Sequence, residues 1–284
     1  MATFYNQATL SYNGFVTNSN ITEGELVAAV SATKTAISES YGAGAGISYV
    51  ISIVNTSNAT LTGVTVTDDL GTYTQGGLTL RPLDYVDGSV RLFINGVLVD
   101  APEASVDGVL TFSGISIPAG AAAMLIYQTR ANEFAPIGQG ASITNTATVG
   151  GTGCGEITAS ATVNAEESIS LTIAKAISPD TVSCGEELSY TFIIQNTGNL
   201  PADAGTAIAV ADIFNPSLSG ISVTLNGGAF PATSYTYDEE SGSFATAPGA
   251  ITVPAATYTQ NTETGVITTT PGVAILTVSG TVGP

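Results

Sequence analysis

Apolar and polar side chains alternate over short stretches that are separated by turn residues. Residues 47–54 and 190–195 are rich in β-branched side chains and alternate with a period of two, which is typical of strands with one face in a core. The dipeptides at 95–96 and 226–227 are both Asn-Gly, and they favour tight hairpins because both residue types tolerate positive φ. No stretch shows a convincing amphipathic helical period. The pattern predicts an all-β protein.

Two stretches of the chain are similar enough to be copies of one domain. One starts at Lys34 with Lys-Thr-Ala-Ile-Ser, and the other starts at Lys175 with Lys-Ala-Ile-Ser-Pro. Each lysine is followed at equal distances by a tyrosine and an Asn-Thr pair, at 49 and 55–56 in the first copy and at 190 and 196–197 in the second. Several short strands separated by turns in each copy favour two tandem immunoglobulin-like β-sandwiches.

The two copies differ at their ends. Residues 143–149 read as a last alternating strand of the first copy, whereas the second copy stops at residues 278–284, which match the strand before the last. The N-terminal segment repeats the pattern of residues 144–149, and it consists of Tyr5, Asn6, Gln7, Ala8, Thr9 and Leu10. The predicted organisation is an N-terminal arm with a donor strand (1–28), a first sandwich (29–150), a junction (151–168) and a second sandwich that lacks its final strand (169–284).

The spare strand and the missing strand together suggest a mode of assembly. A sandwich without an edge strand exposes unpaired backbone groups and part of its core, and a free strand of the right alternation satisfies both. The arm would have to fold back past the first sandwich to reach the second one in its own chain, so we expect it to enter another copy. This head-to-tail contact does not close on itself and therefore generates filaments. The alternative is that residues 1–20 are a frayed arm and the second sandwich does without the strand.

The only two lysines of the chain stand at equivalent places in the two repeats. By the period of two, each shares a strand face with apolar residues, and an aspartate in the middle strand of each copy points to the same interior. An asparagine faces inward from the last strand of the first copy and from the matching place in the arm. The two sets are Lys34, Asp68 and Asn145 in the first sandwich, and Lys175, Asp212 and the arm residue Asn6 for the second.

Such a trio has a chemical use. Burial favours the neutral, nucleophilic amine of a lysine, and a protonated aspartic acid beside it can polarise an asparagine carboxamide. Attack of the amine on the amide carbon releases ammonia and leaves an isopeptide bond. The expected bonds join Lys34 to Asn145 within a subunit and Lys175 to Asn6 between subunits. The alternative is a plain Lys–Asp ion pair with a hydrogen-bonding asparagine.

These residues carry a resemblance to a known family. The strand Asn-Thr-Ala-Thr-Val at 145–149, the lysine-led first strand and the strand Val-Thr-Asp-Asp-Leu at 66–70 are similar to those of the prokaryotic conserved-repeat immunoglobulin-like surface proteins. The trio resembles that of pilin and adhesin domains with intramolecular isopeptide bonds. The resemblance covers residues from about 30 to the end, together with the arm, and implies an extracellular, fibrous or stalk-like role without catalysis. The departure is near Ser279, where the second copy has no asparagine.

Composition removes several classes of function. The formal net charge is −18 with only five basic residues, so nucleic acid and anionic membrane surfaces are poor partners. Without any histidine, a Ser-His-Asp site or a His-ligated metal site is impossible. No segment is long and apolar enough to span a membrane. We therefore expect no enzyme acting on outside substrates, no metal, no cofactor and no membrane span. The alternative for a metal is a Ca²⁺ site on the carboxylate pairs at 68–69 and 239–240, although no Ca²⁺-loop spacing is present.

The two cysteines each stand in a Cys-Gly-Glu tripeptide. Cys154 follows the last strand of the first copy and Cys184 lies in an early loop of the second, so both are expected to flank the junction. A disulfide there would stiffen it, which suits a surface-exposed protein. Free thiols and pairing between chains are the alternatives.

The sequence favours a structural subunit of a cell-surface or spore-surface filament whose partner is a further copy of itself. The start of the chain shows no basic segment followed by an apolar one, so either a leader has been removed or export follows another route; assembly inside a spore mother cell that later lyses would fit. A monomeric adhesin with contacts through Tyr235 and Tyr237, and an accessory domain of an enzyme, are the competing hypotheses. The sequence does not identify an anchoring protein.

Overall fold

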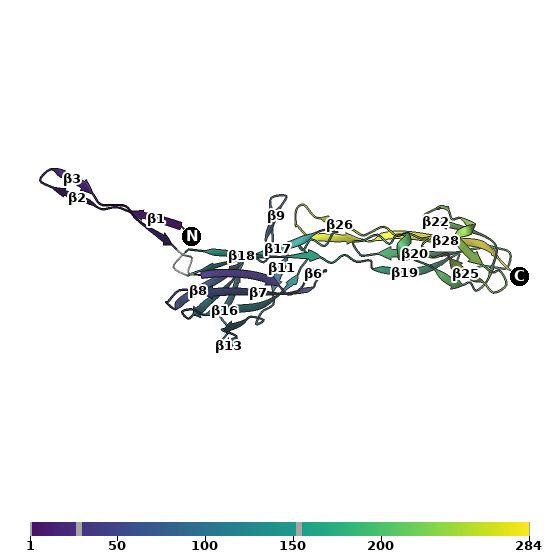
Figure 1. The fold of residues 1–284 in the computed structure, drawn as a ribbon. Helices are drawn as coiled ribbons and strands as arrows, with labels where there is room; N and C mark the ends of the chain where they lie inside the picture. The colour runs from purple at the N-terminus through teal and green to yellow at the C-terminus, as the bar shows by residue number, and fades with distance from the viewer. Residues whose placement is uncertain (1, 27–29, 152–154, 284) are drawn as a thin grey trace.

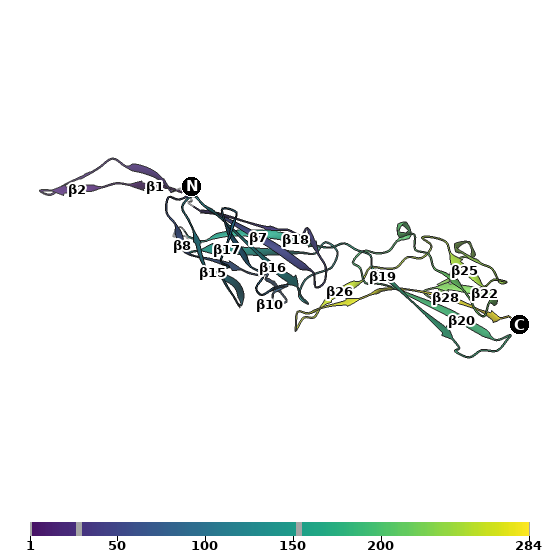
Figure 2. The same cartoon turned by 90° about the horizontal axis from the view of Figure 1, so that it is seen from below.

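The protein is an elongated chain of three parts, an N-terminal arm and two sandwiches, in the computed structural model (Figure 1). The structure describes residues 2–26, 30–151 and 155–283. The arm projects from one end of the first sandwich, and the C-terminus lies at the far end of the second (Figure 1; Figure 2). Strands fill most of the described residues, which contain no α-helix and only two short 3-10 turns. The predicted all-β class is confirmed.

The arm is a two-stranded hairpin in two sections. Strand β1 (Ala2–Asn6) pairs with β4 (Thr22–Leu26), and β2 (Thr9–Tyr12) pairs with β3 (Phe15–Asn18), all antiparallel. The tip turns at Asn13 and Gly14, whose φ angles of 45° and 83° suit these two residue types. Hydrophobic side chains are exposed along it, and those most exposed are Phe4, Tyr5, Leu10, Tyr12, Phe15, Val16 and Ile21.

The first sandwich has one sheet in the order β13-β12-β16-β7-β5, with β11 also paired to β16. The bounds are β5 (Val30–Ala36), β7 (Gly46–Asn55), β11 (Leu83–Tyr85), β12 (Arg91–Ile94), β13 (Val97–Val99) and β16 (Ala122–Ala131). Residues of β7 alternate between buried and partly exposed, as the period of two requires.

The second sheet of this sandwich has the order β14-β15-β8-β17-β18-β6. Its bounds are β6 (Ser40–Tyr41), β8 (Leu61–Asp68), β14 (Glu103–Asp107), β15 (Val109–Ile117), β17 (Ser142–Gly150) and β18 (Ile157–Ala165). The predicted end of this sandwich at residue 150 is wrong, because β18 pairs with β17 along its whole length and buries Val163 in the core. The first sandwich therefore runs from residue 30 to 165, and the junction shortens to 166–170.

The second sandwich, residues 171–283, has a sheet in the order β19-β20-β28-β22-β23 and a smaller one in the order β21-β25-β24. Their bounds are β19 (Leu171–Ser178), β20 (Glu187–Asn196), β21 (Ala211–Ile213), β22 (Leu218–Leu225), β23 (Gly228–Ala229), β24 (Tyr235–Tyr237), β25 (Ser243–Thr246) and β28 (Gly272–Val282). Its apolar core is separate from that of the first sandwich.

The two sandwiches have the same strand order except at one edge of the smaller sheet of the second sandwich. Reading β13-β12-β16-β7-β5 against β23-β22-β28-β20-β19 pairs every strand of the larger sheets. The smaller sheets begin alike, with β14-β15-β8 against β24-β25-β21, and the second sandwich then stops where β17 and β18 stand in the first. Two strands are thus absent from the second sandwich among the described residues, rather than the single one expected from the sequence.

Local features confirm the repeat. Both predicted Asn-Gly hairpins form, with positive φ at Asn95 and Asn226 and at the glycines that follow them. The Asn-Thr pairs mark equivalent buried asparagines: the Asn55 amide donates to the carbonyls of Ala59, Ile117 and Pro118, and Asn196 donates to those of 200 and 254. These side chains tie the end of β7 or β20 to neighbouring loops, which is why the same residue type stands in both copies.

The two sandwiches touch through loops and one extra hairpin. This hairpin, β26 (Thr257–Gln260) with β27 (Ile267–Thr270), lies beside the hairpin β9 (Tyr73–Gln75) and β10 (Leu78–Leu80) of the first sandwich (Figure 1). The Gln260 amide donates to the Tyr73 hydroxyl at 2.8 Å, and the Asn199 amide donates to the Ile137 carbonyl at 3.1 Å. These contacts hold the sandwiches end to end.

Candidate crosslinking site and open sheet edge

The first sandwich buries a charged pair in its core. Lys34 points inward from β5 and Asp68 from the end of β8, with 2.5 Å between Nζ and Oδ2, and both side chains are fully enclosed. Asp68 also accepts hydrogen bonds from the Tyr127 hydroxyl and from the backbone N–H of Leu70. Asp68 rather than its neighbour Asp69 faces the core, as the parity of the strand indicated. The pair is thus held by contacts from β16 and from the turn that follows β8.

Asn145 completes the cluster from β17. It is fully buried, and its carboxamide oxygen accepts from the backbone N–H of Gly71 at 3.2 Å. Its carboxamide nitrogen has no hydrogen-bond partner among the described residues. Two residues further along β17, Ala147 is paired directly with Asp68. The Asn145 carboxamide also acts on the Tyr49 and Tyr127 hydroxyls by lowering their pKa, which places it beside the tyrosine that donates to Asp68.

Burial shifts the pKa of three groups in this cluster. Burial lowers the pKa of Lys34 below its ordinary value, and this outweighs the attraction of Asp68, which acts in the opposite direction. Burial also raises the pKa of the Tyr49 and Tyr127 hydroxyls well above their usual range, so both remain protonated. A lowered pKa favours the neutral amine of a lysine, which is the form that acts as a nucleophile.

The second sandwich holds the matching pair in an open setting. Lys175 on β19 forms an ion pair with Asp212 on β21, but their side chains are 39% and 21% exposed, against 0% for both partners in the first sandwich. The Lys175 ammonium lies over the rings of Tyr190 and Phe214, at 4.5 and 5.7 Å from their centres. These two rings stack at 4.4 Å. The pair therefore packs against aromatic rings on one side and is exposed to solvent on the other.

The uncovered side is where β17 and β18 stand in the first sandwich. Strand β8 pairs with β15 on one edge and β17 on the other, whereas β21 pairs with β25 alone among the strands that the structure describes. Every residue of β19 is exposed, whereas its counterpart β5 has Val30 and Lys34 buried. An edge strand with free backbone groups next to exposed apolar side chains is a site for strand addition.

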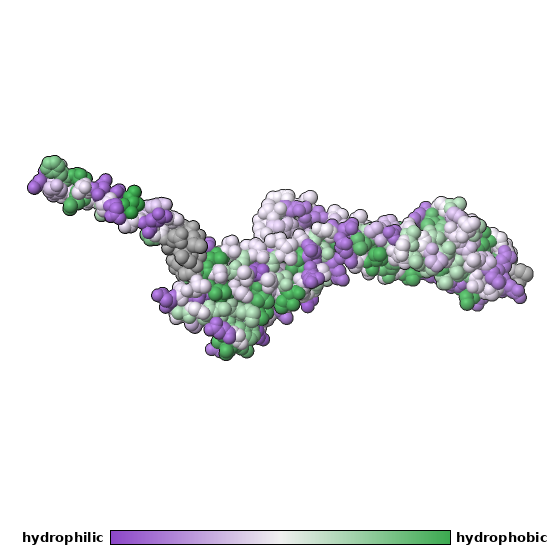
Figure 3. Space-filling view, viewed as in Figure 1, coloured by the Kyte–Doolittle hydropathy of each residue, from purple (hydrophilic) through white to green (hydrophobic). Residues whose placement is uncertain are grey.

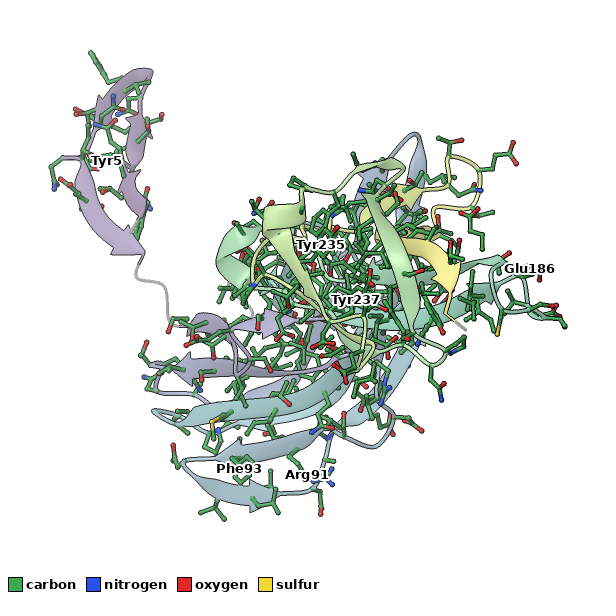
Figure 4. The ribbon with its side chains drawn as sticks, turned by 90° about the vertical axis from the view of Figure 1, so that its right-hand side faces the viewer. Tyr5, Arg91, Phe93, Glu186, Tyr235 and Tyr237 are labelled. Atoms are coloured by element: carbon green, nitrogen blue, oxygen red, sulfur yellow. The ribbon has the colours of Figure 1, made fainter. Side chains whose placement is uncertain are left out.

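The arm carries the predicted donor residues away from any sandwich. Tyr5, Asn6, Gln7, Ala8, Thr9 and Leu10 are all exposed, and Figure 4 shows Tyr5 well apart from both sandwiches. Residues 7 and 8 separate β1 from β2 along the chain. There the carbonyl of Ala8 accepts a hydrogen bond from the backbone N–H of Ser19. Asn6 therefore lies far from Lys175 of its own chain, and within one molecule the structure brings together only the first trio.

Cys184 lies elsewhere than expected. It is an exposed free thiol in the loop before β20, and the next residue, Gly185, donates to the carbonyl of Val282 near the C-terminus. This is the end of the second sandwich away from the junction, so the expected position beside the junction is wrong. Cys154 lies outside the described residues, and a disulfide between the two stays a prediction.

Tyr235 and Tyr237, which would make the contacts of an adhesin, pack against the core of the second sandwich. Tyr235 stacks near Phe230 and Phe244, and the Tyr237 hydroxyl both accepts from and donates to the backbone of Leu218. Both are partly buried (Figure 4). They are packing residues, so they give no support to a monomeric adhesin.

Several partners in these sites were not apparent from the sequence. Tyr127 comes from a strand far from Asp68 in the chain. In the second sandwich the aromatic ring near the ion pair is that of Phe214, which is not at the position equivalent to Tyr127. Only the short distance from Asp212 to Phe214 hinted at the latter. No cluster of metal-binding side chains occurs in residues 2–26, 30–151 and 155–283, and no helix in the same ranges could cross a membrane.

The difference in burial predicts unequal effects on stability. In the monomer, Asp68→Ala should destabilise the first sandwich by about 3–5 kcal/mol, because it leaves a buried lysine without its partner. Asp212→Ala should cost the second sandwich about 0–1 kcal/mol, because that pair is solvent-exposed. Calorimetric unfolding of both variants checks this; equal shifts of the two transitions would contradict it.

Neither a family model nor a curated protein matches the chain. Among solved structures, a variant of BcpA, the major pilin subunit of Bacillus cereus, is 13% identical with a TM-score of 0.38, covering 95% of this chain and 73% of that chain. The major pilin SpaD of Corynebacterium diphtheriae is 12% identical with a TM-score of 0.36, covering 84% and 58%. The collagen adhesin CNA of S. aureus is 11% identical with a TM-score of 0.30, covering 52% and 54%. The chain thus spans less than two thirds of SpaD and of CNA, and functional conclusions rest on its own residues.

Proposed function

We propose that the protein is the structural subunit of a cell-surface or spore-surface filament, in which the arm of one copy completes the second sandwich of the next. The observation that carries this is the match between the open edge at β21 and the position of β17 in the first sandwich. In the first sandwich the corresponding edge of β8 is filled by β17, and the arm has a sequence similar to that of β17. Each copy carries an arm and the open edge at β21, so addition continues head to tail.

The arm has the side chains that the open site needs. In β17, the residues facing the core are Ile143, Asn145, Ala147 and Val149. The corresponding arm residues are Phe4, Asn6, Ala8 and Leu10. Three of them are apolar and one is the asparagine, so docking in this register buries hydrophobic surface that is exposed in the free arm. The register also places Ala8 opposite Asp212, as Ala147 stands opposite Asp68.

Docking would enclose Lys175 and Asp212 as Lys34 and Asp68 are enclosed, and would bring Asn6 to them. A proton passes from the lysine ammonium to the aspartate, the neutral amine attacks the carboxamide carbon of Asn6, and the carbon–nitrogen bond of the carboxamide breaks. The nitrogen leaves as ammonia, and a lysine–asparagine isopeptide bond joins the two subunits. The same step between Lys34 and Asn145 crosslinks the first sandwich internally. No oxidant, cofactor or outside substrate takes part.

A cysteine pair tests the proposed register. With Cys154 and Cys184 replaced by serine, Thr9→Cys combined with Ala211→Cys should give disulfide-linked oligomers on mild oxidation, because the register of Thr148 with Thr67 places these residues opposite each other. The matched control joins Thr9→Cys to Ile213→Cys, two residues and about 7 Å along the strand. Equal crosslinking of both pairs, or none of the first, would contradict the register. The gels are run with Lys175→Met so that disulfides alone link the chains.

A further inference from the structure

We infer that the arm donates both of its strands, so that the whole hairpin of residues 2–26 takes the place of the β17–β18 hairpin in a second copy. This inference rests on the proposed function and changes what is exchanged: β4 covers β19 while β1 and β2 pair with β21. The partner surface is therefore the exposed face of β19 together with the edge of β21. A single donated strand would leave the first of these open.

The two hairpins have the same register at the reactive asparagine. Asn6 is paired with Thr22, and Asn145 is paired with Ala161. Sixteen residues separate the partners in both cases, from 6 to 22 and from 145 to 161. Superposing one asparagine on the other therefore superposes β4 on β18. A frayed arm has no reason to reproduce this spacing.

The second strand has a defined task in the first sandwich. Strand β18 packs along β5 from the facing sheet, and it buries Val163 completely. In the second sandwich no described strand lies there, and Ile173 and Ile177 of β19 are 57% and 50% exposed. Figure 3 shows hydrophobic residues at the surface of the second sandwich on the side where Figure 1 places β19. One strand beside β21 leaves this face uncovered.

The face of the arm that would meet β19 carries no charge near Asn6. Thr22 and Gly24 pair with Asn6 and Phe4, so these four share one face, whereas Glu23 pairs with Tyr5 on the other. The Phe4 ring lies so close to Gly24 that any side chain there would collide with it. The uncharged face can lie against isoleucines while Glu23 stays in water, as Thr162 does on the outer side of β18.

The direction of the chain also fits. Strand β18 leads through residues 166–170 into β19 of the following sandwich, and β4 leads through residues 27–29 into β5. A docked hairpin would therefore send the rest of its own subunit beyond the end of the acceptor. The contact between subunits repeats the connection between the two sandwiches of one chain.

The test compares two substitutions on β19 in the full-length protein. Ile177→Asp lies on the face that β4 would cover, and Ala176→Asp is the matched control on the opposite face. Because a buried unpaired carboxylate is costly, Ile177→Asp should raise the protein concentration needed for filament formation by at least about tenfold, and Ala176→Asp should leave it unchanged. Pelleting of polymer across a concentration series gives the value. Filament formation is the readout because it does not require the covalent bond.

A second variant addresses the other side of the same contact. Thr22→Glu lies in the exposed arm, where it cannot unfold either sandwich, and it should raise the assembly concentration to a similar extent. If Ile177→Asp and Thr22→Glu both assemble like the unmodified protein while removal of residues 2–12 prevents assembly, the arm donates one strand and the inference is overturned. If removal of residues 2–12 also leaves assembly intact, the proposed function falls with it.

Discussion

Deleting residues 2–12 should leave the protein monomeric under conditions in which the full chain forms filaments. These residues supply the strand that would pair with the free edge of β21, and no other described segment carries the same inward series of Phe4, Asn6, Ala8 and Leu10. Light scattering measures the mass, and electron microscopy shows whether filaments are present. Filaments of unchanged appearance from the shortened chain would contradict strand donation.

Two single substitutions make the same test without shortening the chain. Ala8→Asp puts a carboxylate where Ala147 is fully buried in the first sandwich and directly opposite Asp212, so it should abolish filaments. Gln7→Asp adds the same group on the outer face and should assemble normally. In the monomer of either variant the arm remains exposed, so neither substitution is expected to affect folding of the sandwiches.

Asn6→Ala should give filaments that separate into monomers on boiling in detergent and reducing agent, whereas the unmodified protein should give a ladder of multimers. The alanine still fits the docked strand but offers no carboxamide carbon for Lys175. Lys175→Arg should have the same effect, because the guanidinium remains charged and does not attack. Denaturing gels of purified filaments provide the measurement.

The matched control is Asn145→Ala, which removes only the bond expected within a subunit. It should keep the ladder, and the intact mass of each subunit should be higher by one ammonia than expected for a fully reacted chain, after correction for the substitution. A ladder that persists in Asn6→Ala would show that another linkage joins the subunits. An unmodified chain without any loss of ammonia would dismiss the bond between Lys34 and Asn145.

Much of this organisation follows from local sequence pattern. The period of two places Lys34 and Asp68 on inward faces, and the internal repeat carries the same reasoning to Lys175 and Asp212. The alternation at 143–149 and at 5–10 is likewise local. Such features depend only on which face of a strand a residue occupies, and the face follows from whether the residue lies an even or odd number of positions from a known inward residue.

The features that were missed depend on pairing between distant strands. Tyr127 reaches Asp68 because β16 lies beside β7, which no local pattern reveals. Strand β18 comes after a glycine-rich stretch of sequence, and β4 reads Thr-Glu-Gly-Glu-Leu with little β-branched character, so local pattern predicts neither of these second strands of the hairpins. The position of Cys184 depended on where β20 and β28 meet at the C-terminal end. In each case tertiary contacts, rather than propensity, determine the structure.

A reconstruction of the assembled filament at side-chain resolution tests the central claim most directly. The account predicts density for residues 2–12 of one subunit beside β21 of its neighbour, with Ala8 opposite Asp212 and Asn6 against Lys175. Density showing this edge filled by another segment of the same chain, or the arm extended in solvent away from β21, would contradict it.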